Sequence, residues 1–206
     1  MSVPSAQQPS PVDGRTARGQ RTRRKVVDAL LSLQEEGDLT PTARRVAERA
    51  GVALRTVFGH FSDMESLWAE AGTQELDKLM ALAVEVPDYL PVADRVALFA
   101  ASRARTLEAL LPVMRSARLR EHCSPQLLAN RALFIAAADD EVKQAFGPEL
   151  AALDENADTL LCALYLVSGG IAWEALRHDR GLGVVAAADV LRRTVSHLVD
   201  PSGGFS

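Results

Sequence analysis

Apolar residues recur every three to four positions along most of this chain, which is the spacing of amphipathic helices. Prolines and glycines interrupt the pattern and mark where one helix ends and the next begins. No segment alternates apolar and polar residues for long enough to indicate a strand. The pattern predicts an all-α protein of about nine helices without internal repeats. Their expected ranges are 21–36, 41–50, 54–61, 63–84, 91–111, 113–121, 125–146, 149 or 156–178, and 184–199.

The most informative stretch is residues 40–61, TPTARRVAERAGVALRTVFGHF. Thr40 is expected to cap a helix that starts at Pro41, where a missing N–H costs nothing. Gly51 can end that helix in a left-handed conformation without a steric penalty. A second short helix is then expected over Leu54–Phe61. Two helices joined by a tight glycine turn are typical of the unit that lays a helix in the major groove of DNA.

The second helix of this pair is predicted to have one buried and one exposed side. Val57 and Phe61 are four residues apart, so they share the face available to a core. The residues left outward or on the rim are mostly short or basic: Arg55, Thr56, Phe58, Gly59 and His60. Such a face suits a groove lined by base edges and phosphates. On spacing alone, an ordinary helical hairpin within an all-α core remains the alternative.

The flanking segments favour the DNA-binding interpretation. Residues 21–36 form an amphipathic pattern that supplies the third helix such a unit needs. The residues Ser62-Asp63-Met64-Glu65 match a capping box, so a long helix is expected directly after the short one.

The chain here resembles the TetR family of bacterial transcriptional regulators. The resemblance covers roughly residues 21–68 and rests on the order and spacing of Thr42, Arg44, Val46-Ala47, Ala50-Gly51-Val52, Arg55-Thr56-Val57-Phe58, His60-Phe61, Glu65 and Leu67. It implies an N-terminal helix-turn-helix domain, a helical ligand-binding domain and a homodimer. The implied DNA-binding residues are Arg21, Thr42, Arg44, Ala53, Leu54, Arg55, Thr56, Phe58, Gly59 and His60.

Three residues depart from that family's usual pattern. Ala53 stands where a Ser or Thr would cap the recognition helix. Phe58 replaces the more usual Tyr, and Met64 replaces a Lys often found at the start of the next helix. Each change removes a group that would hold the DNA backbone, which carries much of the affinity.

Charge divides the chain unevenly. Residues 1–61 hold ten Lys/Arg and six Asp/Glu, a net of +4, whereas residues 62–206 hold thirteen and twenty-one, a net of −8. A local basic surface is what phosphates feel within a Debye length. The overall net charge of −4 therefore does not exclude nucleic acid as a partner.

The first 20 residues are rich in Pro, Ser and Gln and are expected to be a disordered arm, because they lack the apolar surface needed to fold. A basic cluster follows at 15–25, which either lies along DNA or belongs to a soluble tail. The expected domains are this arm (1–20), a DNA-binding domain (21–66) and an effector-binding and dimerisation domain (67–206).

The composition fits a cytoplasmic protein that does not span a membrane. Cys123 and Cys162 have no metal-ligand spacing and are expected to be reduced packing residues. No apolar run reaches the ~20 residues needed to cross a bilayer. The four histidines lack metalloprotease spacing, and neither a nucleophile elbow nor a phosphate-binding loop is present, so we expect no enzyme, cofactor or metal site.

Residues 158–176 are apolar on nearly all sides, and residues 184–198 carry an apolar stripe. Two such helices from each of two subunits would form a four-helix bundle, and the TetR resemblance favours this dimer over packing within one chain. The expected interface residues are Leu160, Leu164, Trp173, Val184, Leu191 and Val195.

The resemblance also implies a cavity for a small-molecule effector between the helices expected at 91–111, 125–146 and 149–178. Its candidate lining residues are Phe99, Arg103, Leu107, Met114, Arg118, Asn130, Arg131, Phe134, Cys162, Tyr165 and Ser168. We expect a homodimeric repressor that binds a palindromic operator in double-stranded DNA and is released by its ligand. The alternative is a helical adaptor that binds protein through residues 40–61.

Overall fold

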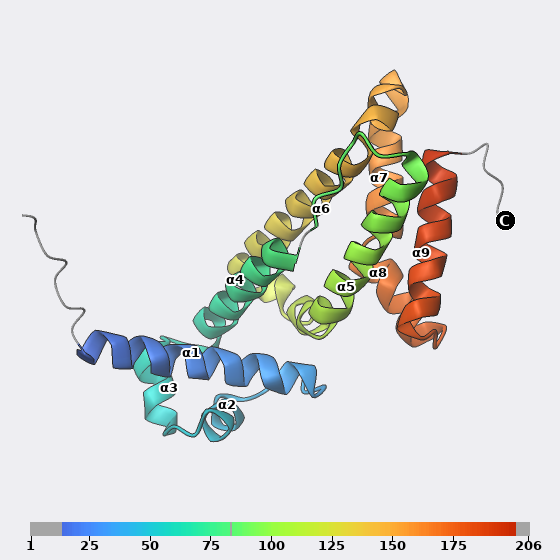
Figure 1. Ribbon diagram of the computed structural model, residues 1–206. Coiled ribbons are helices and arrows are strands. Elements are labelled where there is room, and N and C mark those ends of the chain that lie inside the picture. The colour runs from blue at the N-terminus through green and yellow to red at the C-terminus, as the bar shows by residue number, and fades with distance from the viewer. Residues whose placement is uncertain (1–13, 83, 201–206) are drawn as a thin grey trace, which may run out of the picture.

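Helices form all the regular structure of the residues that the computed structural model describes, 14–82 and 84–200 (Figure 1). The α-helices are α1 (Gly14–Glu35), α2 (Ala43–Ala50), α3 (Leu54–His60), α4 (Met64–Leu82), α5 (Val92–Arg118), α6 (Pro125–Ala151), α7 (Ala157–Val167), α8 (Gly170–Glu174) and α9 (Val184–Val199). Short 3-10 turns, η1 (Glu121–Cys123) and η2 (Asp154–Asn156), precede α6 and α7, and a π turn, η3 (Ala175–Asp179), extends α8. The all-α class expected from the sequence is confirmed.

The first four helices share one core. Val26, Val27 and Leu30 of α1 are fully buried, and they belong to a cluster that includes Val57 of α3 and Leu67 of α4. Figure 1 shows α2 and α3 on the side of α1 that faces away from the rest of the molecule. The short helix α3 therefore lies at one end of the protein.

The later helices build a second core. Phe99 of α5 and Phe146 of α6 meet edge to face, with ring centroids 5.1 Å apart. Leu164 of α7, Trp173 of α8 and Leu191 of α9 complete the same buried cluster. Helices α5 and α9 run side by side in Figure 1, because the apolar stripe of α9 packs on α5.

The starts of α1, α2 and α4 differ from the sequence expectations. Helix α1 begins at Gly14, so the expected disordered arm cannot extend to residue 20; residues 1–13 lie outside the described part of the chain. The cap of α2 is Thr42, whose hydroxyl accepts a hydrogen bond from the Arg45 N–H at 3.4 Å, and not Thr40. The cap of α4 is Asp63, which accepts from the Ser66 N–H at 2.7 Å, whereas the sequence suggested Ser62 with Glu65.

Helix α5 is continuous through Pro112, so the two helices expected at 91–111 and 113–121 are one. Leu111 and Val113 on either side of the proline are buried, and this tertiary packing outweighs the lost backbone hydrogen bond. Helix α6 likewise passes the expected stop at Gly147, but it kinks at Phe146, where φ is −129° and ψ is 24°. The single helix expected to end at His178 is instead interrupted between α7 and α8 at Ser168 and Gly169.

The segment Asp154–Asp179 has the length and mean hydropathy, 1.5, of a membrane-crossing helix. A core helix of a soluble protein passes the same test, and this segment is broken where α7 ends. One-third of its most apolar window is buried, through residues such as Leu164 and Trp173. Leu166 and Ile171 point their apolar surface outward instead.

One ion pair ties the start of α5 to the end of α6. The Arg95 guanidinium donates two hydrogen bonds to the Glu149 carboxylate, one of them at 2.8 Å. The Arg95 side chain is 5% exposed and also donates to the Leu90 and Ala145 carbonyls. The hydrogen bonds from Arg95 hold the pKa of Glu149 below its ordinary value of 4.5.

Replacing Glu149 with Gln should therefore lower the free energy of unfolding at pH 7 by about 1–3 kcal/mol, because a charged hydrogen-bonding partner is lost. The lowered folded pKa means that Glu149 stabilises the protein above the unfolded pKa of 4.5, and the contribution disappears as the pH falls through the folded value. Urea denaturation of both proteins between pH 7 and 3 should show their difference shrinking below about pH 4.5. A difference that is constant with pH would contradict this assignment.

Candidate nucleic-acid interface and internal cavity

The turn between α2 and α3 depends on Gly51. Its backbone is left-handed, with φ 66° and ψ 36°, as expected from the sequence. The Gly51 N–H donates to the Glu48 carbonyl, and the Val52 N–H donates to the Ala47 carbonyl at 3.0 Å. These bonds close the end of α2 and turn the chain toward α3.

Helix α3 is held by one side and exposed on the other. Val57 is 1% exposed, and Phe61, directly after the helix, is 2% exposed. Arg55, Phe58 and Gly59 are exposed. Two further residues of the expected DNA-binding set, Ala53 and Leu54, are also exposed, while Thr56 and His60 are half-buried. Of the seven residues predicted here, five are thus exposed and two are half-buried.

The DNA-binding residues expected on α1 and α2 differ in whether their side chains already have partners within the protein. Arg21 and Arg44 are exposed. Thr42 is exposed, but its hydroxyl already caps α2. Arg45 pairs with Asp38 at 2.7 Å, and Arg49 pairs with Glu36 at 2.5 Å, an ion pair that lowers the pKa of Glu36. These two pairs hold α2 against the end of α1.

Arg23 has a structural role that the sequence did not indicate. Its guanidinium donates to the His60 carbonyl at the end of α3 and to both oxygens of Glu70 on α4. It also lies 4.2 Å from the centroid of the Phe61 ring. Arg23 therefore joins α1, α3 and α4, and is not free to lie along phosphate as the basic cluster suggested. The adjacent Arg24 and Lys25 remain exposed.

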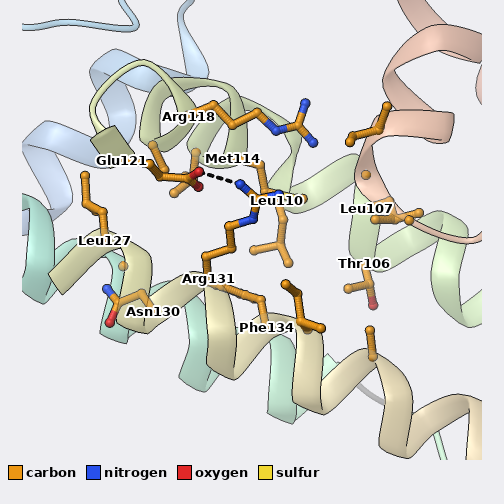
Figure 2. Close-up of a pocket in the computed structure, with 18 of the residues that line it drawn as sticks. Thr106, Leu107, Leu110, Met114, Arg118, Glu121, Leu127, Asn130, Arg131 and Phe134 are labelled. Carbon is orange, nitrogen blue, oxygen red and sulfur yellow. Dashed lines mark hydrogen bonds and ion pairs between the residues drawn. The ribbon is translucent and has the colours of Figure 1, made fainter. Parts of the chain in front are cut away.

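A cavity of about 130 Å³ lies where the two cores meet. Figure 2 shows Leu107, Leu110 and Met114 of α5 and Asn130, Arg131 and Phe134 of α6 around it. Tyr165 of α7 and Gly170 of α8 line another part of the wall. Gln34 of α1 and Trp68 of α4 also line it, which the sequence did not indicate. The cavity is thus bounded by helices of both parts of the molecule.

Eight of the eleven residues expected to line a cavity do so: Arg103, Leu107, Met114, Arg118, Asn130, Arg131, Phe134 and Tyr165. The other three do not. Phe99 is packed against Phe146 in the second core, and Cys162 is exposed. Ser168 is buried, but its hydroxyl donates to the Leu164 carbonyl, and its own carbonyl accepts from Arg103. On a helix, the spacing that identifies a buried face does not tell a cavity wall from a filled core.

Four of the six residues expected at a dimer interface are fully buried within one chain. Leu164, Trp173, Leu191 and Val195 are each at most 2% exposed and form part of the second core. Leu160, at 8% exposure, is buried in the same cluster. Of the six residues, only Val184 lies on the surface. The expected stripe is the inner face of α7–α9. The outward apolar residues of these helices are Leu166, Ile171, Val184, Val185 and Val190.

The fold is shared with solved structures of bacterial regulators. A transcriptional regulator of Rhodococcus sp. RHA1 is 22% identical, with a TM-score of 0.71 over 87% of this chain and 96% of that one. A TetR-family member of Streptomyces coelicolor is 21% identical, with a TM-score of 0.58 over 84% of this chain and 97% of that one. A regulator of Mesorhizobium loti described as TetR-family is 16% identical, with a TM-score of 0.62 over 88% and 96%. No protein-family model matches the sequence, and no relative is found among curated proteins.

The all-α arrangement of a small helix-turn-helix unit and a larger helical unit is therefore the fold of the TetR-family transcriptional regulators. The similarity extends over nearly the whole length of those chains, well beyond residues 21–68 where the sequence resemblance lies.

Helix α3 begins without a capping side chain, because Ala53 has no hydroxyl, although its φ of −70° and ψ of 146° are those of a capping residue. Replacing Ala53 with Ser should raise the free energy of unfolding by about 0.5–1 kcal/mol, through a bond to a free N–H of the first turn. Chemical denaturation measures this change. Ala97→Ser, at an exposed position inside α5, is the matched control and should be neutral or slightly destabilising. Equal effects at both positions would contradict the assignment.

Proposed function

We propose that this protein is a DNA-binding transcriptional regulator that places α3 in the major groove. The observation that carries the proposal is the geometry of α3. The helix follows a left-handed glycine turn, is held through Val57 and Phe61, and presents Arg55 and Gly59 at one end of the molecule. A groove about 12 Å wide admits a helix presented in this way.

The distribution of charge supports DNA as the partner. The exposed basic residues Arg21, Arg24 and Lys25 of α1 and Arg44 of α2 belong to the N-terminal part, whose net charge is positive. The remainder of the chain is net negative, so phosphates are attracted to the end that carries α3 and repelled from the other. Phosphate contacts would set the position of the protein, and α3 would read base edges.

A homodimer fits the exposed apolar surface of the last helices. Leu166 of α7 is 62% exposed, Ile171 of α8 is 59% exposed and Val185 of α9 is 84% exposed. Exposed apolar residues on consecutive helices favour burial against a second copy. A two-fold dimer would present two α3 helices, and half-sites about 34 Å apart lie on the same side of the duplex. The operator would then be a palindrome.

Release by a ligand is supported by the position of the cavity. It touches α1 and α4 of the N-terminal unit as well as α5–α8, so its occupancy can affect the angle between the two parts. A ligand that binds better to an arrangement unable to span two grooves shifts the population away from the DNA-bound state. The protein would thus act as a repressor in the absence of its ligand.

One observation favours a second function, that of a protein-binding adaptor. Phe58 is 48% exposed and Leu54 is 40% exposed, so α3 offers apolar as well as basic surface. Binding to duplex DNA that weakens steeply with added salt supports a regulator, because counterions are released from phosphate. Binding of protein without such salt dependence would support an adaptor.

Arg55→Ala should weaken specific DNA binding by about 1–3 kcal/mol, as expected for the loss of a side chain that reads guanine. Fluorescence anisotropy with the intergenic duplex beside the protein's own gene provides the measurement. Arg105→Ala is the control, because Arg105 is an exposed arginine of α5, in the other part of the molecule. If wild-type protein binds no duplex more tightly than random sequence, the proposed function is wrong. Unchanged affinity in Arg55→Ala alone would remove only Arg55 from the interface.

Ile171→Asp and Val185→Asp should convert the dimer to monomer, since each places a charge where apolar surface is to be buried. Sedimentation velocity at micromolar concentration distinguishes the two states. Leu133→Asp changes a residue of α6 that is 54% exposed and serves as the matched control. A dimer that survives both substitutions would show that subunits associate through another surface.

A further inference from the structure

Two residues that line the cavity each carry a buried polar atom that lacks a hydrogen-bond partner among the described residues. One is Oε1 of Gln34 on α1, and the other is Nε1 of Trp68 on α4. Gln34 is 1% exposed and Trp68 is 3% exposed, so neither group is open to bulk solvent. Buried polar atoms normally have partners, because an unmade hydrogen bond costs about 1–3 kcal/mol. Two such atoms on residues that line one cavity favour a partner that binds there.

The charged groups of the same wall are already balanced. Arg131 pairs with Glu121 at 2.7 Å, as the dashed line in Figure 2 marks, and Arg118 pairs with Glu174 at 2.9 Å. Arg103 pairs with Glu141 and donates to a backbone carbonyl. An anionic ligand would have to displace one of these carboxylates, so the wall favours a neutral molecule.

The orientation of the Trp68 ring is set from outside the cavity. The Arg120 guanidinium lies 4.5 Å from the ring centroid of Trp68, and Arg120 is not among the lining residues. This cation–π contact holds the indole in place, so its N–H cannot turn away to another partner at little cost.

The size of the cavity limits the ligand. Its volume of about 130 Å³ compares with the ~150 Å³ of an engineered apolar cavity that binds benzene. The remaining wall is mainly aliphatic and aromatic, with Leu107, Leu110 and Phe134 prominent. The body of the ligand must therefore be apolar and about as large as one aromatic ring.

We infer that the cavity binds a small, neutral, mostly apolar molecule whose hydroxyl group hydrogen-bonds to Gln34 and Trp68; this inference rests on the proposed ligand-released regulator. A hydroxyl accepts a hydrogen bond from the indole N–H and donates one to the amide oxygen, so it suits both atoms. A carbonyl can only accept, and a hydrocarbon satisfies neither. Because both residues belong to helices of the N-terminal unit, the hydroxyl would contact the part that carries α3 directly.

Isothermal titration calorimetry of the full chain without DNA tests the inference with three ligands of similar size. They are p-cresol, which carries the hydroxyl, toluene, which lacks it, and benzoate, which is charged. We expect p-cresol to bind at least about tenfold more tightly than toluene, as two added hydrogen bonds allow. Benzoate should bind more weakly than p-cresol. Toluene binding as tightly as p-cresol, benzoate binding most tightly, or no binding of p-cresol would each overturn the inference.

Two substitutions then locate the hydroxyl. Gln34→Leu removes the amide oxygen together with the amide nitrogen, and Trp68→Phe removes the indole N–H; both keep most of the side-chain volume. Both should reduce the preference for p-cresol over toluene by about three- to tenfold while toluene binding persists. Persistent toluene binding also shows that the cavity is still folded. Gln144→Leu, at an exposed site of α6, is the matched control and should keep the wild-type preference. Wild-type preference in both cavity variants would contradict the assignment of these two residues.

Titration of the same proteins with duplex DNA separates this inference from the proposed function. Protein that binds its operator but shows no preference for p-cresol refutes the ligand class and leaves the regulator standing. Protein that prefers p-cresol but binds no duplex specifically refutes the regulator and leaves the ligand class standing.

Discussion

The burial of α1 between two sets of neighbours is the constraint on which the rest of the structure depends. Val26 and Val27 belong to the same buried cluster as Val57 of α3, and that cluster also includes Val113 of α5 and Leu127 of α6. The core of the N-terminal unit is therefore completed by residues of the larger unit. Because α1 is held in this way, α3 can be supported through its inner face alone and leave its other face exposed. In the proposed regulator α3 needs such a rigid support, since misplacement of its side chains would cost base contacts.

The sequence predicted this N-terminal unit well, because its signals are local. The left-handed conformation at Gly51 follows from glycine's lack of a side chain, and the burial of Val57 and Phe61 follows from their spacing of four. Cap positions were less predictable. Thr40 and Thr42 are both capable of capping α2, and the sequence pattern alone does not decide between them. Arg23 looked like one more phosphate contact, because nothing in a linear sequence shows that Glu70 and the end of α3 lie beside it.

The larger unit was less predictable, because its signals are not local. A helix with apolar residues on several sides has more than one surface to bury, and periodicity does not assign which surface meets its own chain. The inner core is formed by Leu164, Trp173, Leu191 and Val195. The outward apolar surface of the same helices comes from Leu166, Ile171 and Val185. Pro112 gave a misleading stop signal, since burial of its neighbours holds α5 together. The fold is shared with bacterial regulators that are 22% identical or less, because a helical core tolerates many apolar substitutions.

The cavity is lined both by residues that the sequence pattern identified and by residues that it did not. Its aliphatic residues come from α5 and α6, and the spacing of apolar positions on those helices found several of them. Gln34 and Trp68 come from helices of the N-terminal unit. From the sequence, a Gln at the end of an amphipathic helix is expected to lie on the surface. Their burial shows that the two units share a wall rather than meeting at a hinge with solvent between them. The proposed ligand would contact both units at once, and the free energy that it would gain from Gln34 and Trp68 depends on the positions of α1 and α4. A ligand that binds one position of these helices better than another would bias the position of α3 by that difference in free energy, which is the coupling between ligand and DNA that the proposed function requires.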